Sequence, residues 1–242
     1  MVDRDPKNFA AVTDTLTEDL KSLQFSAPVA YVYNPLWYAR ESYDLYFRRY
    51  GSKTGRIVLV GMNPGPWGMA QTGIPFGEIN AVQDWMKITA PVGTPENTHP
   101  AKPVTGFSCT RSEVSGRRLW GWASHRFGTP ERFFQSFFVI NYCPLLFLEE
   151  GGRNLTPDRL RAGDRKPLFE ICDRALLRTI EILNPECVIG VGLFAEKRIK
   201  TALSGTGRET GRISHPSPAN PAANRGWQAL IEREFSEQGI TF

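Results

Sequence analysis

The chain has 242 residues, 41% of them hydrophobic, which suffices for one large α/β domain with a substantial core or for two small domains. Its net charge of +4 is compatible with a polyanionic partner and does not require one. The four cysteines are widely spaced and form no Cys-x-x-Cys pair, so we expect reduced thiols, and neither a metal nor another cofactor. The first residues lack the character of a signal peptide, and no apolar run approaches membrane-spanning length. We therefore expect a cytoplasmic protein, associated with the nucleoid in a bacterium.

The N-terminal third begins with helical spacing of apolar residues. Between Pro6 and Gln24 this spacing predicts a helix, within residues 1–25, that packs one stripe on the body of the protein. From Tyr31 to Tyr50, aromatic residues alternate with arginines, a pattern that can bind single-stranded nucleic acid. The spacing of Tyr43, Tyr46, Phe47 and Tyr50 is helical, however, and favours a buried aromatic face instead.

Four apolar runs alternate with helical patterns along the rest of the chain. The predicted strands are 57–60, 133–140, 187–192 and 212–214, and the predicted helices are 36–50, 80–87, 112–127, 167–183, 194–203 and 224–239. This alternation predicts an α/β fold with a central four-stranded parallel sheet and helices on both faces. We find no linker or internal repeat, so we expect a single domain over residues 1–242.

The loop after the first of these strands, residues 61–77, is dense in glycine and proline. Glycines allow backbone to approach a ligand closely, and the loop also carries the amides of Asn63 and Gln71 and the ring of Phe76. This set suits a small, flat, hydrogen-bonding ligand better than a phosphate. An ordinary long loop that caps a sheet is an equally good interpretation of these residues alone.

Three polar side chains follow the ends of predicted strands: Asn63, Asn141 and His215. Because ligands bind beyond the carboxyl ends of parallel strands, we expect the three to converge on one rim. There Phe76 could stack on a nucleobase, and Asn141 could read the N3–H and O4 edge of uracil and reject cytosine. His215 could donate to O2 as the base leaves, and Asn63 could hold a water below the sugar. The chemistry indicated is dissociative hydrolysis of an N-glycosidic bond, although a lone histidine bonded to backbone is the commoner case.

Gly61-Met62-Asn63-Pro64-Gly65 through Phe76-Gly77, together with His215-Pro216-Ser217-Pro218, closely resembles the single-strand-selective monofunctional uracil-DNA glycosylases. Three further blocks carry the same similarity: 109–116, 141–145 and 220–227. The resemblance implies a sandwich of helices around the sheet and excision of uracil and 5-oxidised uracils from single- and double-stranded DNA. Some bacterial relatives also act on xanthine. We expect a monomer that binds neither a metal nor a membrane, and access to C1′ of the sugar requires that the damaged base be flipped out of DNA.

The resemblance also assigns roles to residues. It implies that Asn63 and His215 are catalytic, and that Met62, Gly65, Phe76 and Asn141 bind the base, with Gly65 near C5. DNA contacts are implied for Ser112, Ser217, Pro218, Ala219, Asn220 and Arg225, and Arg212 is a weaker candidate. The pattern departs from vertebrate relatives at Ala219, where they carry a bulky basic residue that wedges into the duplex. We therefore expect weaker activity on duplex than on single strands, unless Asn220 or Arg225 takes over the wedge.

Two other functions remain open at this level. One is a hydrolase of free nucleosides on the same fold. The net positive charge of the chain and the arginines at 111, 117 and 118 argue against it. The other is a non-catalytic binder of single-stranded nucleic acid that uses the aromatic stretch 31–50 and releases no base.

Overall fold

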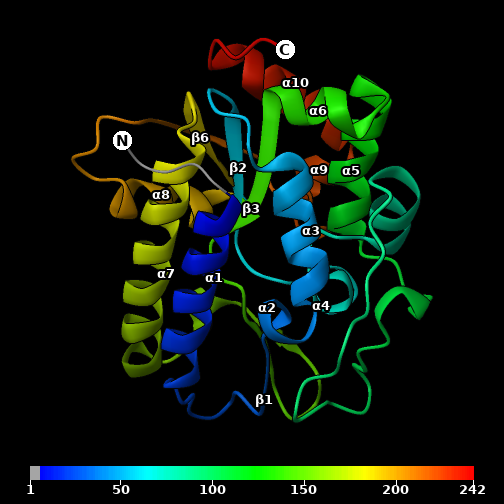
Figure 1. Ribbon diagram of the computed structural model, residues 1–242, viewed down its shortest axis with the longest axis vertical. Coiled ribbons are helices and arrows are strands. Elements are labelled where there is room, and N and C mark those ends of the chain that lie inside the picture. The colour runs from blue at the N-terminus through cyan, green and yellow to red at the C-terminus, as the bar shows by residue number, and fades with distance from the viewer. Residues whose placement is uncertain (1–5) are drawn as a thin grey trace.

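A four-stranded parallel sheet organises the structure, a computed structural model that describes residues 6–242 (Figure 1). Its strands are β2 (Ile57–Gly61), β3 (Phe137–Asn141), β6 (Cys187–Val191) and β7 (Glu209–Ile213), in the order β3-β2-β6-β7. Every residue of β2 and β6 is buried, because helices cover both faces of the sheet and leave no side for water. The predicted fold class is confirmed.

Helices flank this sheet on both sides. In Figure 1, α1, α7 and α8 lie to one side of the strands and α3, α5 and α6 to the other. The helices are α1 (Pro6–Lys21), α2 (Pro35–Tyr38), α3 (Arg40–Tyr50), α4 (Met69–Thr72), α5 (Val114–Phe127), α6 (Pro130–Ser136), α7 (Ala162–Leu183), α8 (Leu193–Ala202), α9 (Pro221–Asn224) and α10 (Trp227–Glu237), with a π-helix at Ala81–Trp85 and 3₁₀ turns at Gly106–Ser108 and Pro157–Arg159. Helix α1 packs against α7, and residues 1–5 of the predicted N-terminal segment lie outside the described residues.

The predicted strand 133–140 was wrong in its first half. Residues 130–136 form α6, which Pro130 starts and the Thr129 hydroxyl caps by accepting from the Arg132 N–H at 3.4 Å. The apolar run continues without a break from this helix into β3, so hydrophobicity alone did not separate the two. The helix predicted from 36 to 50 is likewise divided, since α2 and α3 meet at Ala39.

A second, antiparallel sheet was not predicted. It joins β1 (Tyr31–Tyr33), β4 (Leu146–Leu148) and β5 (Asn154–Leu155) in the order β1-β4-β5. Strands of two or three residues carry too little alternation to be recognised in a sequence. This sheet holds the chain beyond β3 in place beside the carboxyl end of the main sheet.

The aromatic stretch before β2 belongs to the core. Tyr46, Phe47 and Tyr50 are buried, and the Tyr46 hydroxyl donates to the Val139 carbonyl of β3 at 2.9 Å. Tyr50 stacks on Phe134 with ring centroids 4.0 Å apart. The prediction of a buried aromatic face is confirmed, and these rings are not available to stack on nucleic acid bases.

Within residues 6–242, no helix combines the length and the apolar character that crossing a bilayer requires. The same residues contain no group of three or more His, Cys, Asp or Glu side chains placed to hold a metal ion.

Candidate active site

A cavity of about 430 Å³ lies beyond the carboxyl ends of the parallel strands. We call it the site cavity. Its lining residues come from the loop after β2, the end of β3, the start of α5, the β5 region and the loop after β7: Met62, Asn63, Pro64, Gly65, Phe76, Glu113, Ser115, Asn141, Asn154, Thr156, His215, Ser217, Ala219 and Asn220. The predicted convergence of Asn63, Asn141 and His215 is thus confirmed, while their roles remain predictions. The volume falls within the range of sites for small ligands.

Asn63 enters the site cavity two residues after β2 ends. Its Nδ2 donates to the Leu145 carbonyl at 3.1 Å, in the segment that follows β3. Because the amide nitrogen is committed to the backbone, Oδ1 is the atom left to accept a hydrogen bond. A carboxamide held in this way can orient a water molecule.

The pairing of β2 with β3 sets Asn141 and Phe76 side by side. Gly61 and Asn141 are partners across the two strands, and a Cβ at Gly61 would collide with Asn141 Oδ1 and come 2.5 Å from Phe76 Cε2. Only a residue without a side chain leaves room for both groups. Asn141 Nδ2 donates to Met69 Sδ at 3.2 Å, whereas the buried Oδ1 has no partner among the described residues.

Phe76 is held in a strained backbone conformation. Its φ of 54° lies in the left-handed region, which bulky residues rarely adopt. The Trp120 indole donates to the Phe76 carbonyl at 3.0 Å, and a side chain at Gly116 would collide with that same carbonyl. Helix α5 therefore fixes the backbone that aims the Phe76 ring into the site cavity. The ring centroids of Phe76 and His215 are 6.1 Å apart.

His215 follows β7 by two residues, and its surroundings select one tautomer. The Ser217 N–H donates to Nδ1 at 3.0 Å, so the proton of the neutral ring lies on Nε2. Burial lowers the pKa of His215 to about 4, so the ring is neutral at pH 7. The Asn220 amide donates to the His215 carbonyl at 3.0 Å and stiffens the loop. The site thus presents a neutral N–H donor.

The segment behind Asn141 is anchored by a partly buried network. The Tyr142 hydroxyl donates to Asp173 Oδ1 of α7 at 2.8 Å, and Arg198 Nε of α8 donates to the same hydroxyl at 3.1 Å. Arg198 also pairs directly with Asp173. This network ties the end of β3 to two helices on one side of the sheet.

The predicted residues divide into two groups. Met62, Asn63, Gly65, Phe76, Asn141, His215, Ser217, Ala219 and Asn220 line the site cavity, whereas Ser112, Pro218 and Arg225 do not. The exposed Ser112 precedes α5, and Arg225 is exposed at the C-cap of α9. The N-cap of α5 is Glu113, and Ser112 makes no capping bond. Arg212 forms an ion pair with Glu196 at 3.3 Å.

Six residues at or near the site were not among the predicted site residues. Pro64, Glu113, Ser115, Asn154 and Thr156 line the site cavity, and the guanidinium of Arg111 lies 4.8 Å from the ring centroid of Trp67. Asn154 and Thr156 arrive through the unpredicted second sheet. Glu113 was treated as part of a helix start; the glycines at 65 and 68, which make room for its carboxyl, were the available signal.

Comparison with protein families gives a match over residues 48–234 to the uracil DNA glycosylase superfamily. The chain belongs to this superfamily. The single-strand selective monofunctional uracil DNA glycosylase of Mus musculus is 47% identical over 227 residues, which cover 93% of this chain and 81% of that protein. The Bos taurus protein of the same name is 46% identical, covering 93% of this chain and 84% of that protein. The predicted resemblance is confirmed.

The crystal structure of wild-type Pedobacter heparinus SMUG2 has the same fold as this superfamily member. It superposes with a TM-score of 0.68 at 16% identity and covers 94% of this chain and 97% of that chain. At this identity the likeness concerns the fold alone.

Proposed function

We propose that this protein hydrolyses the N-glycosidic bond of uracil in DNA and leaves an intact abasic site. The names of its relatives support the reaction, and one observation supports its assignment to the site cavity. Two carboxamides and a neutral imidazole, from three different strand ends, face the same space with hydrogen-bonding atoms left over. Because C1′ of the sugar is inaccessible inside a DNA duplex, the nucleotide must be flipped into this space.

Base recognition falls to Asn141 and Phe76. The unpartnered Oδ1 of Asn141 would accept the N3–H of uracil, and Nδ2 would exchange its weak contact with Met69 Sδ for O4 of the base. Cytosine presents an acceptor at N3 and a donor at N4, so it would leave both atoms of the amide unpaired. The Phe76 ring supplies a stacking face at the same point.

Departure of the base falls to His215. Its Nε2–H would donate to O2 of uracil, where negative charge grows as the N-glycosidic bond breaks. The neutral ring can perform this task. Because Nδ1 accepts a hydrogen bond from the Ser217 N–H, the single ring proton stays on Nε2, where it can donate to O2. Removal of such a donor typically costs about 100- to 1,000-fold in rate.

Attack on the sugar falls to a water held by Asn63. The free Oδ1 would accept a hydrogen bond from that water and orient its oxygen toward C1′. An amide is too weak a base to deprotonate water, so the sugar must already carry oxocarbenium character when the water adds. No lysine lies in residues 61–77 or 215–218, so a Schiff-base step with strand cleavage is not expected.

Strand preference is set by the loop after His215. Ala219 is exposed at the rim of the site cavity, and a methyl group cannot fill the gap that a flipped base leaves in a duplex. Asn220 is a poor substitute, because its amide donates to the His215 carbonyl and its Oδ1 accepts from Ala222 at 3.1 Å. We therefore propose that single-stranded DNA is turned over faster than duplex, and that the protein acts as a monomer.

The test compares two histidine variants on labelled oligonucleotides that contain uracil, 5-hydroxymethyluracil or xanthine, single- and double-stranded. His215→Ala should lower single-turnover excision of uracil by about 100-fold or more and leave DNA binding in place. His125→Ala is the matched control, since His125 is exposed in the last turn of α5. Equal activity of the two variants, or release from free nucleosides but not from DNA, would disprove the assignment.

A further inference from the structure

Glu113 places a carboxyl group in the wall of the site cavity without an evident structural task. It is the N-cap residue of α5, yet its side chain makes no capping bond to the helix. The carboxyl turns instead toward the loop after β2, where a Cβ at Gly65 would come 2.7 Å from Oε1 and one at Gly68 would collide with Oε2. Two glycines in the ligand-facing loop thus make room for one acid.

The burial of this carboxyl is not compensated within the protein. Oε2 is buried and has no hydrogen-bond partner among the described residues. An unpaired buried polar group destabilises the folded protein, so a native structure that keeps one calls for an explanation. Burial, with repulsion from Glu78, raises the pKa of Glu113 to about 7. Below that pH the group is a neutral acid, with one donor and free acceptor positions.

The position of Glu113 relative to the base follows from the contacts proposed above and from Gly65, which the resemblance to the family implies near C5. If His215 meets O2, Asn141 meets N3 and O4, and Asn63 lies below the sugar attached to N1, one edge of the pyrimidine remains. That edge carries C5 and C6. The carboxyl of Glu113 lies beside Gly65, and the lining residues without an assigned contact also include Pro64, Ser115, Asn154 and Thr156.

We propose that Glu113 is the specificity residue that reads the substituent at C5 of the flipped base. This inference rests on the proposed function. The ligands are uracils with a polar group at C5: a hydroxymethyl group can donate to and accept from the neutral acid, and a formyl oxygen can accept its proton. The methyl group of thymine offers neither bond and would leave the carboxyl unpaired in the site cavity.

The charges around Glu113 come from two other elements. Glu78, in the segment before the π-helix, accepts from the Ala81 N–H at 3.1 Å and repels a second negative charge. His215 faces the same cavity from the loop after β7 and is neutral near pH 7. Ionisation of Glu113 would remove its only proton. It would then still accept from a hydroxymethyl group but could no longer donate to a formyl oxygen.

The first test measures a ratio of single-turnover rates, 5-hydroxymethyluracil over uracil, in single-stranded oligonucleotides. Glu113→Leu should lower this ratio by about tenfold, the usual consequence of one lost hydrogen bond to a polar group. Glu131→Gln, at an exposed glutamate in the first turn of α6, is the control. A ratio that equals that of the wild-type protein, whether both rates fall together or neither does, would overturn the inference.

The second test uses Glu113→Gln, whose amide has nearly the shape of the acid and does not titrate. In the wild-type protein the ratio of 5-formyluracil to 5-hydroxymethyluracil excision should fall as the pH rises through about 7. Any titration of the substrates themselves affects the wild-type protein and the glutamine variant equally. The variant should therefore lack only the fall in the ratio that Glu113 causes. Identical pH profiles would overturn the inference even if Glu113→Leu does not fold. Absence of any base release by the wild-type protein would instead refute the proposed function.

Discussion

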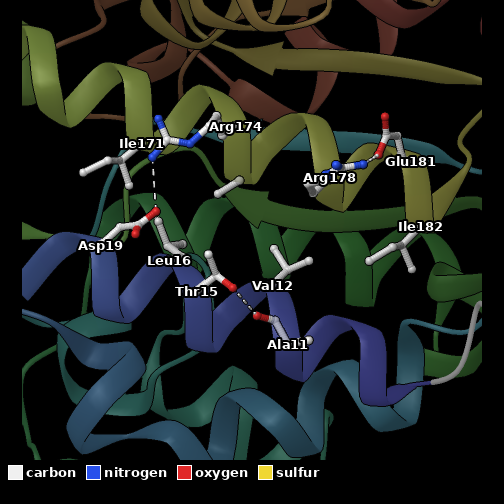
Figure 2. A pocket seen from close by; sticks show the side chains of 11 residues that line it. Ala11, Val12, Thr15, Leu16, Asp19, Ile171, Arg174, Arg178, Glu181 and Ile182 are labelled. Atoms are coloured by element: carbon white, nitrogen blue, oxygen red, sulfur yellow. Dashed lines mark hydrogen bonds and ion pairs between the residues drawn. The ribbon is translucent and has the colours of Figure 1, made fainter.

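Two cavities of this protein have nearly the same size and very different chemistry. The site cavity, of about 430 Å³, lies beyond the carboxyl ends of the sheet, and a groove of about 440 Å³ lies between α1 and α7 (Figure 2). Val12 and Leu16 of α1 and Ile182 of α7 line the α1/α7 groove, as Figure 2 shows. Volume therefore does not distinguish a ligand site from a gap between two packed helices.

The distinction lies in the polar atoms. In the α1/α7 groove they bond to one another or to their own helix: Arg174 pairs with Asp19 at 3.1 Å, Arg178 pairs with Glu181 at 2.8 Å, and the Thr15 hydroxyl donates to the Ala11 carbonyl at 3.0 Å. In the wall of the site cavity, Asn141 Oδ1 and Glu113 Oε2 are buried and have no partner among the residues that the structure describes. Unpaired buried groups cost stability, and a ligand that bonds to them accounts for their presence.

Among substitutions at residues without a chemical role, the largest effect is expected from a single methyl group added at Gly61, at the end of β2. Gly61→Ala would drive Asn141 Oδ1 and the Phe76 ring apart, because both occupy the space of the new Cβ. A shift of about 1 Å in a positioned group costs about 100-fold in rate, and we expect uracil excision to fall by that amount. Single-turnover assays on single-stranded DNA measure it.

Gly121→Ala is the matched control. Gly121 lies in α5 with open space where a Cβ would stand, so alanine should stabilise the helix by up to about 1 kcal/mol. Excision should stay at the wild-type rate. If both alanine variants were equally active, the close packing over Gly61 would not matter for catalysis.

The site cavity should also make stability depend on pH. The pKa of His215 is lowered from 6.5 to about 4, so the unfolded chain binds the proton more tightly than the folded protein. The stability of the folded protein is therefore complete above pH 6.5 and declines as the pH falls toward 4, by about 3 kcal/mol from this group. Urea unfolding at several pH values should show this slope in the wild-type protein and its loss in His215→Gln.

Glu113 contributes a slope of the opposite sign. Its pKa is raised from 4.5 to about 7, so its contribution is present below pH 4.5 and lost as the pH rises through 7. The difference between each variant and the wild-type protein, rather than the wild-type curve, isolates one group. A His215→Gln curve parallel to the wild-type curve between pH 4 and 6.5 would contradict the burial of a neutral imidazole.

The sequence was most informative where one strong pattern acts over a long segment. The fully apolar strands around Val58 and Ile189 and the helical spacing in α7 fixed the α/β class and thereby the edge where Asn63 and His215 meet. The rule that parallel strands present their carboxyl ends on one edge then placed the site. The second sheet could not be predicted from the sequence, because its strands are too short to show a period in hydrophobicity.

The position of Glu113 in the site could not be predicted for a different reason. Its side chain points away from the helix that it begins, and only the three-dimensional approach of residues 65 and 68 shows where the carboxyl lies. The orientation of each amide was equally inaccessible, because Leu145 and Met69, which hold Asn63 and Asn141, are far from them in the sequence. A motif identifies functional groups, whereas packing decides which of their atoms remain free.

A smaller effect is expected at the rim of the site cavity. Ala219→Arg would supply a long basic side chain next to Ser217, where the present loop exposes only a methyl group. Such a side chain can fill the gap in a duplex and contact a phosphate, so the ratio of duplex to single-strand excision should rise by about tenfold. Rates on matched A·U duplex and on the single strand give this ratio, and Ala229→Arg on the exposed face of α10 is the control. An unchanged ratio would mean that the wedge lies elsewhere.

The smallest effect is expected in the α1/α7 groove, where the lining polar groups are paired and those of the site cavity are not. Arg174→Ala removes the ion pair with Asp19, whose side chains are 63% and 39% exposed. Water and salt screen such a pair, so the free energy of unfolding should fall by less than about 1 kcal/mol. Excision of uracil should not change, because the described residues that line the groove contain no unpaired buried side-chain atom for a substrate to satisfy. A loss of excision comparable to that of Gly61→Ala, with the fold intact, would show that paired polar atoms do not mark a cavity as inert.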